Sequence, residues 1–462
     1  MPVRESKRMS PRTVTSRPPV AALSAETGFP FRLDDVRSRS GELGEPAWLL
    51  ERRVQAWEAF NRLPFPSAKD EAWRRTDLRA MPRHSLLLGS ASRVEVDSGL
   101  LQPLAGDTHG ALLCLTPGLE TRHEGGKDLA RRDVIFTDWA SAVRDHAPRL
   151  EPALGRAVAD EEDSFTALAA SLAIDGVVVH VPAGVQVAQP LHSVLWAPGG
   201  ERAFFSRVLV VVEDGASATF VHETASPSEP RGHALHAGIV ELLLGAGAHL
   251  TFVELQTWGY HVWNITHERA IIGREGRLDW IFGAVGSRLT KTFSELNLAG
   301  QGAEARMSGF YFADGTQHLD HDTQQNHLSP HTTSDLLFKG ALVGRGRSVW
   351  QGMIYVAPGA QKADGYQANR NLMLSPQARA DSIPGLEILA DDVRCTHGAT
   401  VGQLEEEPIY YLMSRGLPRR EAARLVVGGF FAPIMDRIPF DGVRARFERM
   451  IDDKLTASEM RG

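Results

Sequence analysis

Cysteines, long apolar runs and an excess of either charge are all scarce in this 462-residue sequence, and each absence excludes a class of protein. The two cysteines, Cys114 and Cys395, are too few for a disulfide framework and are typical of a reducing compartment. No apolar run approaches the roughly 20 residues that span a bilayer. The net charge of −7, with acidic and basic residues mixed along the chain, predicts no broad basic face for nucleic acid. We therefore expect a cytoplasmic protein that binds neither membranes nor nucleic acid.

The motifs of common nucleotide-binding and hydrolytic enzymes are also missing. No Gly-x-x-x-x-Gly-Lys-Ser/Thr phosphate loop occurs, and the sequence contains no Rossmann fingerprint and no Gly-x-Ser-x-Gly elbow. Any nucleotide hydrolysis connected with this chain would therefore have to come from a partner.

Two regions precede the point, at residue 166, where the residue pattern changes to short β-rich runs. Residues 1–40 combine basic residues with Ser, Thr and Pro and predict a disordered tail. An organelle transit peptide is the alternative, which Glu5 and the prolines disfavour. Residues 41–165 predict a mixed, mainly helical region, with apolar residues at helical spacing or in short runs over 46–63, 111–115, 134–136, 139–146 and 165–172.

Residues 166–404 consist of short β-rich runs separated by similar glycine turns. Counted from Gly184, the turn glycines follow at intervals of 31, 32, 29, 26 and 44 residues, at Gly215, Gly247, Gly276, Gly302 and Gly346. Recurrence at this scale is typical of a solenoid, whose units bury their apolar faces only against one another. Because no regular helix intervenes, the pattern favours a parallel β-helix over a leucine-rich horseshoe, while a β-sandwich is the alternative for short strands with glycine turns.

Residues 405–462 return to helical patterns. A helix is expected from 405 to 415, with Gly416 placed to end it and Pro418 suited to the first turn of the next helix. A final amphipathic stripe carries Phe440, Val443, Phe447, Met450, Ile451 and Leu455. Such helices could cap the solenoid, or they could present an apolar groove or ridge to a partner.

Cys395 and His397 form the first group that could carry chemistry. On a strand the two side chains would point to one face, about 6.5–7 Å apart, where a thiolate and an imidazole can share a metal or a cluster. An iron–sulfur cluster usually takes four protein ligands, and Cys114 lies in an apolar run typical of a buried structural cysteine. Further ligands would have to come from another subunit. The alternative is a small core cysteine with a hydrogen-bonded histidine beside it.

A second group contains four histidines and two aspartates within fourteen residues. This density is typical of a metal site, although the spacing matches no zinc-finger or metalloprotease motif. The alternative is a polar ladder on the solenoid surface or a subunit contact. The histidines are His318, His321, His327 and His331.

The segment Cys-Thr-His-Gly-Ala-Thr-Val-Gly at 395–402, continued by residues 410–417, resembles the SufD proteins of the SUF iron–sulfur cluster assembly system, within the SufB/SufD family. Residues 71–78, 318–340 and 364–372 agree with the same family, so the likeness covers roughly residues 45 to 455. One departure is Arg75, where the family usually has an aromatic residue. The paralogue SufB usually has a Glu where Gly398 follows the histidine here.

The resemblance implies a β-helix core with helical ends and a non-catalytic scaffold that pairs with a SufB-type paralogue. Each of the two would bind a SufC-type ABC ATPase, so that residues 405–462 become an ATPase-binding domain with Leu425 and Phe430 as expected contacts. The resemblance gives His397, with Cys395 beside it, the functional role at the interface, where iron or a nascent cluster would be held transiently. ATP would act only through the partner and a sulfur donor system only indirectly. Whether a reduced flavin binds the complex is left open.

Two functions from other classes compete with this interpretation. One is a β-helix enzyme that acts on polysaccharide, with the histidine and aspartate group as its catalytic metal site. The other is a purely structural partner of SufB that contributes surface but no ligand.

Overall fold

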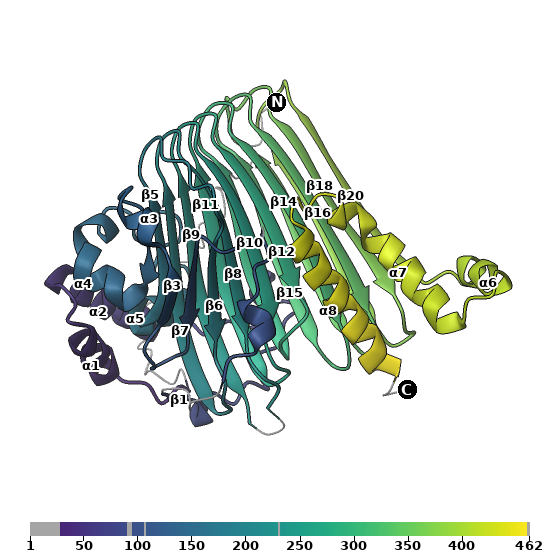
Figure 1. The fold of residues 1–462 in the computed structure, drawn as a ribbon, viewed down its shortest axis with the longest axis horizontal. Coiled ribbons are helices and arrows are strands. Elements are labelled where there is room, and N and C mark those ends of the chain that lie inside the picture. The colour runs from purple at the N-terminus through teal and green to yellow at the C-terminus, as the bar shows by residue number, and fades with distance from the viewer. Residues whose placement is uncertain (1–27, 90–94, 106–107, 230–231, 460–462) are drawn as a thin grey trace, which may run out of the picture.

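A parallel β-solenoid with two strands in each coil forms the centre of the computed structural model, which describes residues 28–89, 95–105, 108–229 and 232–459 (Figure 1). Consecutive strands alternate between two sheets, which we call sheet A and sheet B. Sheet A contains, in spatial order, β19 (Arg379–Ile388), β17 (Arg347–Val356), β15 (His318–His327), β13 (Leu289–Leu298), β11 (Val262–Ile272), β9 (Ala234–Leu244), β7 (Arg202–Val212), β5 (Asp175–Val181) and β4 (Ile135–Asp138), with β1 (Leu87–Leu88) beside β7. Sheet B contains β20 (Arg394–Gln403), β18 (Asp364–Met373), β16 (Thr333–Leu342), β14 (Glu304–Ala313), β12 (Arg277–Ala284), β10 (His249–Thr257), β8 (Ser217–Ala225), β6 (Leu191–Trp196), β2 (Ala111–Leu115) and β3 (Arg122–Gly125).

The pairing within both sheets is parallel except at their first strands. β4 runs antiparallel to β5, and β3 runs antiparallel to β2. The predicted parallel β-helix is therefore confirmed. The predicted boundary at residue 166 is less sharp than expected, because β2 and β4 of the preceding region extend the two sheets of the solenoid.

The interior of the solenoid is formed by every second residue of each strand, because successive side chains of a strand point to opposite faces. In the first coils these residues are mostly Val and Leu, and in the middle coils aromatic rings pack on one another from one coil to the next. The ring of Phe252 lies 5.6 Å from that of Phe220 and 5.4 Å from that of Trp280. Each such fully buried side chain stabilises the fold by roughly 1.5–3 kcal/mol.

One row of turns, between sheet A and sheet B, accounts for the glycine repeat. In this row a residue with positive φ recurs every 27 to 32 residues, at Gly184, Gly215, Gly247, Glu275, Gly302, His331 and Lys362. The N–H of each donates to a carbonyl in the next coil, as from Gly247 to Arg274 (2.7 Å) and from His331 to Gln361 (2.9 Å). The predicted turn at Gly346 belongs instead to the opposite row, between β16 and β17. The 44-residue interval from Gly302 to Gly346 arose because His331, which takes the left-handed conformation in the intervening turn, is not a glycine.

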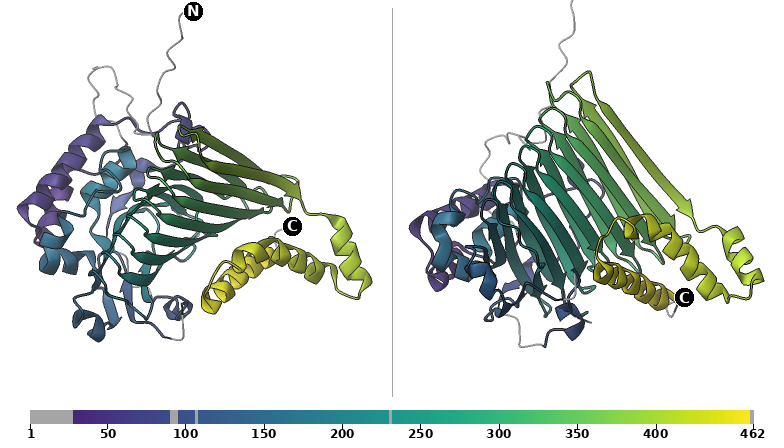
Figure 2. Two further views of the ribbon diagram at one scale, coloured as in Figure 1. Left: turned by 90° about the horizontal axis from the view of Figure 1, so that it is seen from above. Right: turned by 45° about the horizontal axis from the view of Figure 1, so that its top comes forward.

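The N-terminal helices gather at the first coils and cover the outer face of sheet A (Figures 1 and 2). Phe60 and Phe165 from these helices pack with Phe205 and Ile239 of the sheet. The predicted helical stretches agree with the structure. The helices are α1 (Leu33–Leu43), α2 (Ala47–Arg62), α3 (Lys127–Ala130), α4 (Trp139–Leu150) and α5 (Ser164–Leu172), of which α5 crosses the predicted boundary between residues 165 and 166.

The predicted disordered tail, residues 1–40, requires a correction at its C-terminal end. Residues 33–40 lie in α1, because Val36 and the preceding Phe31 are buried and Arg39 donates a hydrogen bond to the carbonyl of Leu172 (3.1 Å). Residues 1–27 lie outside the described part of the chain.

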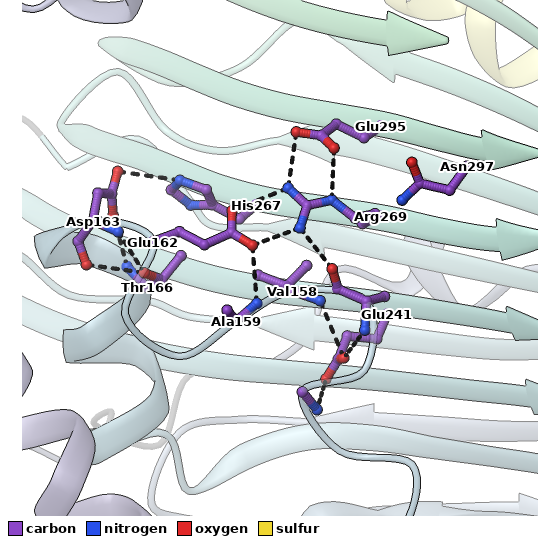
Figure 3. Close-up of polar contacts among 12 residues, drawn as sticks. Val158, Ala159, Glu162, Asp163, Thr166, Glu241, His267, Arg269, Glu295 and Asn297 are labelled. Atoms are coloured by element: carbon purple, nitrogen blue, oxygen red, sulfur yellow. Dashed lines mark hydrogen bonds and ion pairs between the residues drawn. The ribbon is translucent and has the colours of Figure 1, made fainter. Parts of the chain in front are cut away.

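A polar cluster attaches the segment before α5 to the outer face of sheet A (Figure 3). The carboxylate of Glu241 accepts the backbone N–H groups of Gly155 and Ala157, both at 2.9 Å. Asp163 caps α5 and contacts His267 at 3.1 Å, which lowers the pKa of this carboxyl although burial alone would raise it. Arg269 joins Glu162 and Glu295 on either side of it. These partners satisfy one another, so we interpret the cluster as structural.

Of the three C-terminal helices, the last two cover the outer face of sheet B. Phe447 of α8 packs on Phe310, with ring centroids 4.2 Å apart, and the predicted apolar stripe faces the sheet. Gly416, with φ of +94°, follows the first of these helices as predicted, whereas Pro418 stands at the N-cap of the next, one residue before its first turn. The helices are α6 (Glu406–Ser414), α7 (Arg419–Met435) and α8 (Asp441–Glu459). Of the helices in the described ranges, none is long and apolar enough to cross a bilayer.

Candidate functional site at the open end of the solenoid

The last coil leaves both sheets open. Neither β19 nor β20 pairs with a further strand among the described residues, and most residues of β20 are exposed. Apolar side chains accompany these free edges: Val401 is 49% exposed, and Leu386, Ile388 and Leu389 are exposed as well. An uncovered pair of edges with apolar side chains is a template for pairing with another chain.

Cys395 and His397 lie on this last strand, as the sequence predicted for a strand in this position. In the parallel register Cys395 stands beside Gly365 and His397 beside Gln367, and both neighbours are buried. Because side chains alternate along a strand, Cys395 and His397 face the same side, toward the solenoid interior. The interior ends at this coil, so His397 is exposed while Cys395 is half-buried.

The surroundings of the two cysteines differ. Cys395 packs against a small apolar cluster that includes Ile354 and Val356. Burial raises the pKa of its thiol, and the backbone N–H of Gly365 opposes that shift. Cys114 lies in β2 at the opposite end of the solenoid, where it is buried and desolvation raises the pKa of its thiol. A single cysteine therefore stands at the open end of the described chain.

The four histidines of the second group do not come together. His318 is the first residue of β15 and His327 the last, so about 30 Å of extended chain separates them. His321 lies within the strand and His331 follows it. His321 lies among aromatic rings, 5.1 Å from that of Phe282, and His331 occupies a turn. Burial lowers the pKa of His321 to about 3 and that of His327 to about 4. Among the described residues, no group of three or more His, Cys, Asp or Glu side chains could hold a metal ion. Within the described ranges, the histidine and aspartate group is therefore spread along β15 and the following turn.

His318 and Asp320 instead bind the N-terminal region. The hydroxyl of Thr76 contacts His318 (3.0 Å) and donates to Asp320. Asp320 also pairs with Lys291 at 2.9 Å, and both side chains are fully buried. Two stretches that resemble the SufD proteins, residues 71–78 and 318–340, thus meet in space. Sequence reasoning missed Lys291, since a lone lysine on a strand gives no signal of burial.

Among the C-terminal helices, α8 is attached to the solenoid, whereas α6 is exposed. Buried ion pairs hold α8 to the solenoid, from Arg446 to Glu223 (2.8 Å) and from Lys454 to Asp314 (2.6 Å). A groove of about 660 Å³ lies between α7 and α8. Figure 2 shows α6 projecting past the last strand, and its Tyr410 is 62% exposed.

The two predicted ATPase contacts lie in different environments on α7. Leu425 lines the groove and is 56% exposed, so it is available to a partner. Phe430 is half-buried against the apolar cluster under the helix, and the ammonium of Lys339 lies 4.6 Å from its ring centroid. Phe430 therefore supports the attachment of α7 to sheet B.

The stacked coils, the helices packed on both sheets and the unpaired last strands β19 and β20 define the described part of this molecule as a parallel β-solenoid with helical ends. The family models agree: SUF system FeS cluster assembly, SufBD core domain, matches residues 195–430, and the SufBD protein N-terminal region matches residues 115–192. The chain belongs to the SufBD family of SUF-system iron–sulfur cluster assembly proteins.

Individual relatives agree with this assignment. The iron–sulfur cluster assembly protein SufD of Bacillus subtilis is 30% identical over 424 residues, which is 91% of this chain and 97% of that protein. SufB of the same organism is 26% identical over 440 residues, covering 91% of this chain and 92% of that protein. A SufBD family protein of Staphylococcus haemolyticus is 25% identical over 428 residues, covering 88% and 89%.

Proposed function

We propose that this chain is a SufD-type scaffold subunit that pairs with a SufB-type paralogue through the open end of its solenoid. The observation that carries the proposal is that β19 and β20 pair with no further strand in the described ranges, while His397 and apolar side chains are exposed on these strands. A sister solenoid with a similar last coil could continue both sheets across the interface by backbone hydrogen bonds.

His397 and Cys395 contribute to holding iron or a nascent cluster at that interface. The open end provides one thiol and one imidazole, whereas a cluster usually takes four protein ligands. The remaining thiolates come from the partner in this proposal. Neutral imidazole and thiolate are both suitable ligands for iron.

The C-terminal helices bind the ABC-type ATPase, and ATP acts on the complex only through that partner. The exposed apolar residues Tyr410, Tyr411 and Leu425 supply a contact surface away from the solenoid. ATP binding then brings two ATPase subunits together and moves the helical ends, which opens the interface between the two scaffolds. The groove beside Leu425 gives the helices a surface on which such a partner can act.

The test of the interface role uses His397→Ala. Because the side chain is exposed, the variant should fold and assemble, while cluster delivery in cells should fall sharply. Co-purification followed by an anaerobic iron and sulfide assay measures both properties. Full delivery by His397→Ala, and also by a Cys395→Ser/His397→Ala double variant, would support a purely structural partner instead.

The ATPase contact is tested by a pull-down with Leu425→Asp. The exposed position should tolerate the charge, so binding of the ATPase should drop while the melting temperature stays unchanged. Phe430→Asp is an unsuitable probe, since it would unfold the attachment of α7 to sheet B. The matched control is Leu119→Asp, which places the same charge at an exposed leucine of the N-terminal region, remote in sequence from α7. Equal ATPase recovery by Leu425→Asp and the control would overturn this contact.

A further inference from the structure

We infer that His327 and Cys395 form a pair of ligands for a divalent transition-metal ion such as Fe²⁺, on the interior side of the last coil. The inference rests on the proposed role of Cys395 and adds a residue from β15 to it. It joins one member of the second histidine group to the cysteine at the open end.

The pair is brought together by Gly365. A side-chain carbon at Gly365 would lie 3.1 Å from Nε2 of His327 and 3.3 Å from Sγ of Cys395. Those two distances place the nitrogen and the sulfur no more than about 6.4 Å apart. Atoms that share a zinc-like ion through bonds of about 2.0–2.3 Å lie at most about 4.6 Å apart, a separation that the 6.4 Å bound allows.

The hydrogen bonds around His327 fix which ring nitrogen is available. The amide of Gln325 donates to Ser334 (2.6 Å) and to the carbonyl of Tyr366 (3.1 Å), so the Ser334 hydroxyl is left to donate to Nε2 of His327 (2.8 Å). On the other side, Thr332 donates to the carbonyl of Ser329 (3.1 Å) and therefore accepts the Nδ1–H of His327 (2.8 Å).

This arrangement is the one that metal-binding histidines use. Nδ1–H is held by the Thr332 hydroxyl, and the lone pair of Nε2 faces the Ser334 hydroxyl, whose proton occupies it at present. A metal ion would replace the Ser334 proton at Nε2. Binding at Cys395 forms a metal–sulfur bond and releases the thiol proton to solvent, so the charge of the ion is partly balanced.

A second observation points to a cation. Oε1 of Gln325 has no hydrogen-bond partner although this side chain is fully buried, and the same holds for Oε1 of Gln367 beside His397. Both are oxygen acceptors in the interior of the last coils, and unpaired buried acceptors are costly. An ion held by two protein ligands keeps further coordination positions open for the partner chain or for sulfide. Such incomplete coordination is expected of an ion that is bound only transiently.

The experiment is an anaerobic titration of the purified full chain with Co²⁺, whose thiolate bond gives a near-ultraviolet charge-transfer absorption. A Cys114→Ala background leaves Cys395 as the single thiol. In this background Cys395→Ser should abolish the band, and His327→Gln should weaken Co²⁺ binding at least tenfold. The matched control is His331→Asn, which removes a neighbouring histidine but suits a residue with positive φ. A melting curve for each variant checks folding.

Gly365→Ala is a second variant, since its methyl group would enter the space between sulfur and nitrogen and should also weaken binding. Co²⁺ affinity of His327→Gln equal to that of the His331→Asn control would overturn the inference, as would an unchanged band in Cys395→Ser. These results are independent of cluster delivery in cells. Loss of delivery in His397→Ala with normal Co²⁺ binding in His327→Gln would overturn the inference alone, whereas His327-dependent binding with full delivery by His397→Ala would overturn the proposed function.

Discussion

The two ends of the solenoid are built from the same kind of coil but are finished in opposite ways. At the first end, antiparallel strands β3 and β4 extend the two sheets, and the N-terminal helices pack on the outer face of sheet A. There Arg53 binds Glu45 and the carbonyls of Ser171 and Ala173. At the last end, β19 and β20 keep free edges and exposed apolar residues.

This difference teaches where the chain packs on its own helices and where it leaves the sheet edges to which, in the proposed function, a partner binds. A free, apolar sheet edge is a liability for a monomeric protein. The last strands β19 and β20 expose apolar side chains, whereas the edge strand β3 at the first end is short and polar. The residues with suitable metal chemistry, Cys395 and His397, lie at the last end. Substitutions at the first end should therefore alter stability, and substitutions at the last end should alter assembly.

The largest effect is expected from Arg53→Met at the first end. The substitution leaves the buried carboxylate of Glu45 and two carbonyls without their donor, which should reduce the free energy of unfolding by about 3–5 kcal/mol. Urea unfolding measures the change. Arg62→Met removes an exposed ion pair with Glu161 and should change the same quantity by less than about 0.5 kcal/mol. Equal losses in the two variants would contradict the assignment of Arg53.

The next effect is expected from Val401→Glu at the open end. A charge on the free edge should weaken association with the SufB-type paralogue at least tenfold, or about 1.4 kcal/mol, without lowering the melting temperature. Analytical ultracentrifugation of mixtures gives the affinity. Leu87→Glu introduces the same charge at an exposed leucine near the first end and should leave association unchanged. If both variants associate normally, the free edges are not the interface.

The pH dependence of stability should distinguish the interior from either end. Burial among aromatic rings lowers the pKa of His321 to about 3, so the unfolded chain binds the proton more tightly than the folded chain. Stability from this group is present above the ordinary histidine pKa near 6.5 and is lost as pH falls toward 3.

Replacing His321 by Phe should therefore flatten the acid side of the stability curve. Between pH 6 and 5 the wild-type chain should lose about 1 kcal/mol more than His321→Phe, because one proton is bound on unfolding. Urea unfolding at pH 7, 6 and 5 provides the comparison, with the exposed His397→Ala as control. Parallel curves for His321→Phe and the wild type would show that His321 is not buried in its neutral form.

The smallest effect on stability is expected from His397→Ala. The side chain is exposed on the last strand, so its loss should change the free energy of unfolding by less than about 0.5 kcal/mol. This variant sharpens the comparison of the ends, since its defect should be confined to cluster delivery. A destabilisation of 2 kcal/mol or more would place His397 in a structural role.

Much of the fold could be predicted because its signals are local. Helical spacing marked α2, α4, α5 and the stripe of α8, and recurring glycines marked the solenoid coils. The repeat was followed correctly through Gly302 and then lost, because His331 takes the left-handed turn without the residue that usually signals it. The end of the predicted tail was misplaced for a related reason: α1 is short and polar, and it is stabilised by contacts with α2 and α5.

The site could be predicted only in part. Cys395 and His397 are two residues apart, so strand geometry alone puts them on one face. The four histidines from His318 to His331 are near in sequence but lie apart in space. His318 contacts the N-terminal region, His321 and His327 lie in the interior, and His331 occupies a turn. In contrast, His327 and Cys395 are 68 positions apart and meet across Gly365. Proximity along a strand is a poor guide to proximity in space, since each residue adds about 3.3 Å.

The sequence by itself determined the kind of architecture: apolar residues at period two, with turns about every thirty residues, can bury their faces only by stacking as coils. It also determined that the chain carries too few thiols to complete a cluster. Only the tertiary structure decided which coil would be last, which edges stay free, and which distant side chains share the interior beside them. Those outcomes depend on contacts between coils and on the helices that pack on the sheets, and no local pattern of residues contains them.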